Sequence, residues 1–148
     1  MSPLALDATL AIVHHLIVFS LVAVLVAELV IADGAVDAQR LHQLGRLDGA
    51  YGGLAALALL VGFSRAVFGA KGWSFYAGNP IFWAKVGVFV LIGLLSIVPT
   101  VRLIRWRRSG TLPDAAALRS ARAWMRAQVA LLAAILAFAA LMARGIGH

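Results

Sequence analysis

Four stretches of the chain are long and apolar enough to cross a lipid bilayer, and this constrains the fold more than any other feature. They cover residues 6–31, 47–68, 80–101 and 126–143. About 20 apolar residues in a helix span the roughly 30 Å of bilayer hydrocarbon, so each stretch predicts a transmembrane helix. No connecting stretch suggests a separate soluble domain. The sequence therefore predicts an all-α fold, a transmembrane antiparallel four-helix bundle that forms one domain over residues 1–148.

Composition supports a membrane location and excludes several functions. Of the 148 residues, 63% are hydrophobic and 13% are charged, which is more apolar side chain than one small soluble core can bury. The net charge of +7 is concentrated between the hydrophobic stretches, which argues against nucleic-acid binding. The chain has no cysteine, so disulfides, thiolate metal sites and a cysteine nucleophile are excluded.

The basic residues predict an orientation. Because cytoplasmic loops are enriched in Lys and Arg, the first and third connections are predicted to lie inside a bacterial inner membrane and both termini outside. The same arginines could also bind anionic lipid headgroups. These connections and the adjoining helix ends hold nine of the 13 basic residues: Arg40, Arg46, Arg102, Arg105, Arg107, Arg108, Arg119, Arg122 and Arg126.

Small residues recur every fourth position at the start of the second stretch, at Gly45, Gly49 and Gly53. Such a series lets another helix approach closely. The neighbour could be internal or a second copy of the chain, so a homo-oligomer through this face is one prediction.

Ionisable side chains inside a span cost roughly 2.5–3.5 kcal/mol each, so they usually face the bundle and mark a pair, a pathway or a ligand. One polar layer is predicted in the outer half of the membrane. It contains His14 and His15 of the first helix, Arg65 of the second and Lys85 of the third.

A second polar layer is predicted near the inner face, where Glu28, Asp48, Tyr51, Arg102 and Arg105 reach a similar depth. Carboxylates and guanidiniums at one depth can neutralise each other, which predicts a structural salt-bridge lock, with a proton path as the alternative.

Helical geometry links the two layers on the first helix. His14 and Glu28 are fourteen positions apart, which places them within about 40° of each other, on the same face as Leu21 and Leu25. If Glu28 faces the bundle, so does His14.

The histidines suggest a cofactor. Zinc and calcium sites need several more nitrogen, sulfur or oxygen ligands than this layer offers. Haem needs only one or two axial ligands, and Lys85, Arg65 or Lys71 could pair with its propionates. The alternative is that the two histidines are hydrogen-bonded packing residues.

A resemblance to one family extends over nearly the whole chain. It is carried by the segments HHLIVFSLVAVLVAELV, GRLDGAYGGLAALALLVGFSRAVFGAKG, NPIFWAKVGVFVLIGLLSIVPTVRLIRWRR and ALMARGIG. They resemble small bacterial membrane proteins known only as a domain of unknown function.

A fainter resemblance is to the four-helix haem-containing membrane protoporphyrinogen oxidases of bacteria. It is carried by His15-Leu16-Ile17 and Phe82-Trp83-Ala84-Lys85. That family binds haem b and oxidises protoporphyrinogen to protoporphyrin. The resemblance implies that His15 is an axial ligand and that Lys85 is a functional residue beside cofactor, substrate or propionate. The spacing of Trp83 and Lys85 is tighter than in that family, and Glu28 replaces an expected Arg- and His-bearing stretch. A shared haem pocket is therefore expected rather than a shared substrate.

Three functions follow as hypotheses. The leading one is a haem b-binding protein of oxidoreductase or electron-transfer type, with Lys85 in a catalytic role and a membrane redox partner. The second is an ion- or proton-coupled transporter that uses Glu28, Asp48, Lys85 and the histidines. The third is an accessory subunit of a membrane complex that docks through the glycine face. No motif supports hydrolase, kinase or nicotinamide chemistry.

Overall fold

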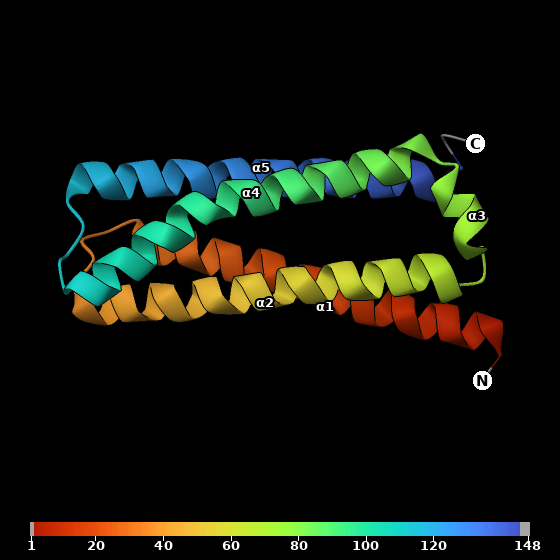
Figure 1. Cartoon of the computed structure of the whole chain (residues 1–148), viewed down its shortest axis with the longest axis horizontal. Helices are drawn as coiled ribbons and strands as arrows, with labels where there is room; N and C mark the ends of the chain where they lie inside the picture. The colour runs from red at the N-terminus through yellow and green to blue at the C-terminus, as the bar shows by residue number, and fades with distance from the viewer. Residues whose placement is uncertain (1, 146–148) are drawn as a thin grey trace.

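The computed structural model describes residues 2–145 and consists of five helices joined by short connections (Figure 1). Four of the helices are long and apolar enough to cross a membrane, which confirms the all-α bundle. Each predicted stretch lies within one long helix. A short helix that was not predicted precedes the third long helix. The helices are α1 (Pro3–Ala32), α2 (Ala38–Phe68), α3 (Gly72–Ala77), α4 (Pro80–Ser109) and α5 (Ala115–Ala143).

Local sequence explains where the long helices begin and end. Ser2, Asp37, Asn79 and Asp114 each precede a long helix, and the side chain of each accepts a backbone N–H of the first turn. The helix α4 ends at Gly110, which has a positive φ of 66° that glycine adopts without steric cost. These capping residues end the helices close to one another along the chain, so the connections are short. Because the connections are short, each long helix runs antiparallel to the next.

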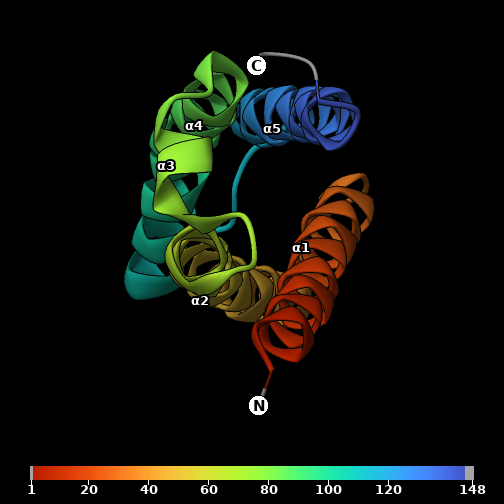
Figure 2. The ribbon, with the colours of Figure 1, turned by 90° about the vertical axis from the view of Figure 1, so that its right-hand side faces the viewer.

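The long helices pack as two hairpins. Helix α1 packs most extensively against α2, and α4 against α5, while α2 with α4 and α1 with α5 make smaller contacts. The diagonal pairs, α1 with α4 and α2 with α5, make no backbone contact in the described part of the chain. Figure 2 shows the resulting order around the bundle, α1, α2, α4, α5.

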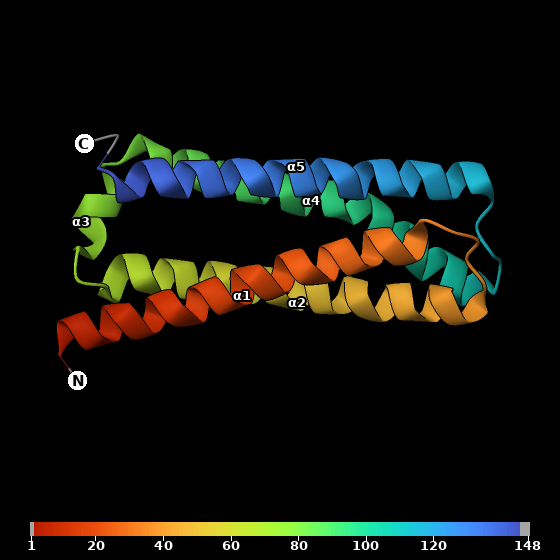
Figure 3. The ribbon, with the colours of Figure 1, turned by 180° about the vertical axis from the view of Figure 1, so that it is seen from behind.

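The two ends of the bundle differ. One end, called the arginine-rich end below, holds the α1–α2 and α4–α5 connections. The opposite end, called the α3 end, holds α3 and both ends of the described chain (Figure 1). The buried residues of α1 all lie between Leu21 and Ala32, and those of α5 between Leu118 and Leu132, so the main core fills the arginine-rich half. Toward the α3 end α1 and α5 diverge (Figure 3). A smaller cluster of Ala66, Tyr76 and Phe82 joins α2, α3 and α4 there.

Candidate functional site

His14 lies at the contact between α1 and α2, in the half of the bundle nearer α3. The ring is half-buried beside Gly62, where an added Cβ would lie 3.2 Å from its Cε1 atom, and it is near the backbone of Ala58. Its Nδ1 atom is buried without a hydrogen-bond partner. Its Nε2 atom also has no partner among the described residues but is not buried. One nitrogen therefore faces α2, and the other makes no hydrogen bond within the described residues.

His15 lies about 100° further around α1 and occupies its exposed face. Its Nδ1 atom is 2.6 Å from the carbonyl oxygen of Ala11, so Nδ1 donates the proton to its own helix. The ring makes an edge contact with His14, at 6.2 Å between centroids. The structure thus turns His14 toward the neighbouring helix and leaves His15, the residue assigned by resemblance, on the outside.

Lys85 of α4 is half-buried and lies within electrostatic range of His14 and Arg65. Because α1 and α4 are diagonal helices, this places Lys85 across the bundle from His14. Its Nζ lies 6.0 Å from the centroid of the Phe82 ring on the same helix. Neither a carboxylate nor a hydrogen-bond acceptor pairs with Lys85 within residues 2–145.

Arg65 has a partner that was missed in the sequence. Its Nε atom donates to Asp7 of α1 at 3.3 Å, in a partly buried pair that joins α1 to α2. Tyr76 lies nearby, and burial raises the pKa of its hydroxyl group. The sequence could have indicated Asp7, because it lies seven residues before His14 and the two residues therefore share one face of α1. His14, Arg65 and Lys85 therefore share a region in which Asp7 balances only one of two cations.

The second polar layer is buried in the main core. Glu28 is 2% exposed, Tyr51 4% and Gln128 1%, and each has an oxygen atom without a hydrogen-bond partner. Tyr51 lies within electrostatic range of Glu28 and Asp48. Gln128 was not singled out from the sequence, because an uncharged amide in an apolar stretch does not indicate whether it faces the bundle or the lipid. The prediction that Glu28 shares a face with Leu21 and Leu25 is confirmed, since both leucines are 1% exposed.

The predicted salt-bridge lock in this layer is wrong. Asp48 accepts a hydrogen bond from Thr100 at 2.7 Å, and neither Arg102 nor Arg105 pairs with a carboxylate in the described chain. Arg102 follows Thr100 by two residues, so it points about 160° away from the side of α4 that faces Asp48. The ion pair at this end instead joins Arg122 to Asp33, at 2.6 Å.

The glycine face is partly open. The Arg107 side chain covers Gly45, where an added Cβ would clash with it, whereas nothing lies within 4 Å of an added Cβ at Gly49 or Gly53. Association of two copies through this face stays a prediction.

Comparison with known proteins gives a family. Residues 6–147 match the family described as "Predicted membrane protein (DUF2214)". No curated protein and no solved structure gives a significant match. Because the family match covers nearly the whole chain, and the structure has four helices that are able to span a membrane, the protein belongs to this family of membrane proteins.

Proposed function

We propose that the protein binds haem b between its two hairpins, in the half of the bundle nearer α3, and acts as an oxidoreductase or electron-transfer protein. The observation that carries this proposal is the open Nε2 atom of His14, which lies within electrostatic range of the unpaired cation Lys85. Both side chains belong to the half of the bundle where α1 and α5 bury no residues.

The histidine fits an axial ligand. A ligating imidazole usually directs one ring nitrogen at a protein acceptor, which fixes the ring, and offers the other nitrogen to the metal. In His14 packing takes the place of that acceptor, because Nδ1 is buried beside Gly62 of α2 without a hydrogen-bond partner, and Nε2 makes no hydrogen bond within residues 2–145. Haem iron requires only one or two such ligands. His14 would therefore hold the iron, and the position of His15 on the exposed face makes it the weaker candidate.

The positive charges of Lys85 and Arg65 match the two carboxylates of haem. A cation in a membrane interior is costly without a partner, and Lys85 has none within the described residues. Asp7 pairs with the Nε atom of Arg65, at 3.3 Å, and the Nη atoms of that guanidinium have no partner within the described residues. An apolar group that carries two carboxylates would pair with both cations.

When bound, haem would supply one-electron chemistry, and a membrane redox partner would exchange those electrons. The residues of this chain would ligate it, fix its orientation and neutralise its carboxylates. The similarity to protoporphyrinogen oxidases stays a prediction, and it supports a shared haem pocket rather than a shared substrate. We also propose that the arginine-rich end faces the cytoplasm from a bacterial inner membrane.

The Lys85→Met variant tests the charge argument. We expect it to bind haem about ten-fold more weakly than the wild type, because one carboxylate loses its cation in a low-dielectric site. Haem titration of the detergent-purified protein measures this, with Lys71→Met as the control. Lys71 is exposed, and its Nζ lies 4.3 Å from the Phe75 ring centroid, so its loss should leave the affinity unchanged. Equal weakening in both variants would contradict the role of Lys85.

A second candidate function is proton transfer through Glu28. The observation that favours it is a carboxyl group that is 2% exposed and has an oxygen without a partner, beside Tyr51. Burial of an unpaired carboxylate is costly, so such a group is stable as the neutral acid and can bind and release a proton.

Proton flux into liposomes tests this second candidate. In this case Glu28→Gln should slow the flux at least about ten-fold, since removal of an essential proton carrier typically costs that much or more. Asp33→Asn, which changes a carboxylate on the exposed connection, is the control. Wild-type flux no faster than that of empty liposomes would exclude proton transfer.

A further inference from the structure

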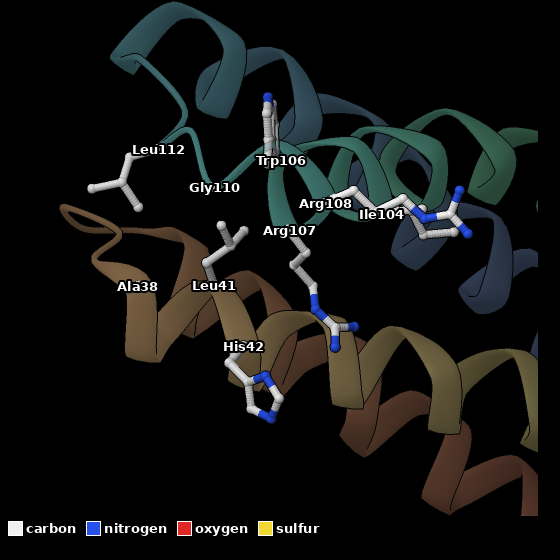
Figure 4. Close-up of a pocket in the computed structure, with 9 residues that line it drawn as sticks. All are labelled: Ala38, Leu41, His42, Ile104, Trp106, Arg107, Arg108, Gly110 and Leu112. Atoms are coloured by element: carbon white, nitrogen blue, oxygen red, sulfur yellow. The ribbon is translucent and has the colours of Figure 1, made fainter.

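A pocket that two arginines help to line lies between α2 and α4 at the arginine-rich end, with a volume of about 560 Å³. Figure 4 shows the Arg107 side chain reaching from α4 toward α2, where it lies beside His42. Arg108 and Trp106 of α4 also line the pocket. The full lining is Ala38, Leu41, His42, Ile104, Trp106, Arg107, Arg108, Gly110 and Leu112.

No acidic side chain of the described residues neutralises the positive charge of this pocket. None of its lining residues is acidic. Neither Arg107 nor Arg108 takes part in the ion pairs of residues 2–145, which are Arg65 with Asp7 and Arg122 with Asp33. Two arginines and a histidine therefore line one pocket that has no acidic residue in its lining.

An apolar groove continues from this pocket along the membrane-spanning part of α2 and α4. It has a volume of about 450 Å³, and glycine on α2 and aliphatic side chains on α4 form most of its surface. Ile104 lines both the pocket and the groove, and the Arg107 side chain covers Gly45 where they meet. The acidic side chain in the groove, Asp48, is hydrogen-bonded to Thr100.

We propose that this surface binds one anionic phospholipid, with its headgroup in the pocket lined by His42, Arg107 and Arg108 and an acyl chain in the groove along Gly49 and Gly52. Basic pockets between transmembrane helices are suited to acidic lipid headgroups, and guanidinium groups hydrogen-bond phosphate oxygens in pairs. The apolar groove distinguishes a lipid from free phosphate, because only a lipid fills both parts. The site is on the α2–α4 side of the bundle and is independent of the haem proposal.

Binding of defined lipids to the full-length protein tests the proposal. The protein is delipidated in neutral detergent, and phosphatidylglycerol, phosphatidylcholine or inorganic phosphate is then added while binding is followed by native mass spectrometry and thermal unfolding. We expect phosphatidylglycerol to bind and stabilise the wild type, and the other two to have little effect. Arg107→Gln and Arg108→Gln should each weaken lipid binding about five-fold, as loss of one headgroup cation does.

Two further variants make the test specific. Arg119→Gln removes an exposed charge at the same end but outside the pocket, so lipid binding should not change. Gly49→Leu fills the groove at a position with nothing within 4 Å of an added Cβ, so the variant should fold and lose lipid affinity. Equal weakening by Arg119→Gln would show diffuse attraction and overturn the site. Equal stabilisation by phosphate would show a simple anion site, and full binding by Gly49→Leu would exclude the groove.

Discussion

The His14→Ala variant is expected to lose at least about ten-fold in haem affinity, whereas His15→Ala should retain most of it. The Nε2 atom of His14 makes no hydrogen bond within the described residues and lies in the half of the bundle that contains Lys85, and loss of an axial ligand removes the bond that holds the iron. His15 lies on the exposed face of α1. Haem titrations of the two variants measure the difference. The adjacent histidines are matched controls, since they have the same chemistry and depth.

The reverse result would assign the ligand to His15, as the resemblance implies, and would mean that haem binds on the exposed side of α1. Unchanged affinity in both variants, and in the double variant, would exclude histidine ligation.

The Gly62→Leu variant is expected to be less stable than the wild type by about 1–3 kcal/mol, the usual cost of overpacking. An added Cβ at Gly62 already lies 3.2 Å from the His14 ring, so a larger side chain must displace either the imidazole or α1. We also expect haem affinity to fall, because the ring would lose its orientation. Thermal unfolding in detergent and haem titration measure the two effects.

Gly53→Leu is the control for this substitution. Gly53 lies on the same helix, but nothing is within 4 Å of an added Cβ there. The control should therefore unfold near the wild-type temperature. If Gly62→Leu were as stable as Gly53→Leu and bound haem normally, the close contact between His14 and α2 would not matter for function.

Much of the fold could be predicted because hydrophobic length alone determines transmembrane helices. Helical phase also predicted the buried face of α1, where Leu21, Leu25 and Glu28 are 1%, 1% and 2% exposed. The short helix α3 was not predicted, because Gly72–Ala77 is too short to show a periodic pattern.

The side-chain partners could not be predicted, because depth along a helix does not give direction around it. Glu28 and Arg102 were placed at one depth, but Arg102 points away from the side of α4 that holds Thr100. Asp48 therefore pairs with Thr100, at 2.7 Å, and not with an arginine. The pairing of Asp7 with Arg65, 58 residues apart, depends on the crossing of α1 and α2, which a single sequence does not specify.

The arrangement of the hairpins was likewise beyond the sequence. Each stretch is predominantly apolar along its length, so hydropathy does not indicate that the core fills one half of the bundle. The divergence of α1 and α5 toward the α3 end is what leaves His14 and Lys85 outside that core.

The central claim of haem binding is tested most directly by the absorption spectrum of the wild-type protein, purified in detergent after expression with added haem and recorded oxidised and dithionite-reduced. Haem binding predicts a Soret band in the oxidised protein and sharp α and β bands after reduction. A folded, colourless protein after haem supplementation would contradict haem binding and favour the second candidate, proton transfer through Glu28.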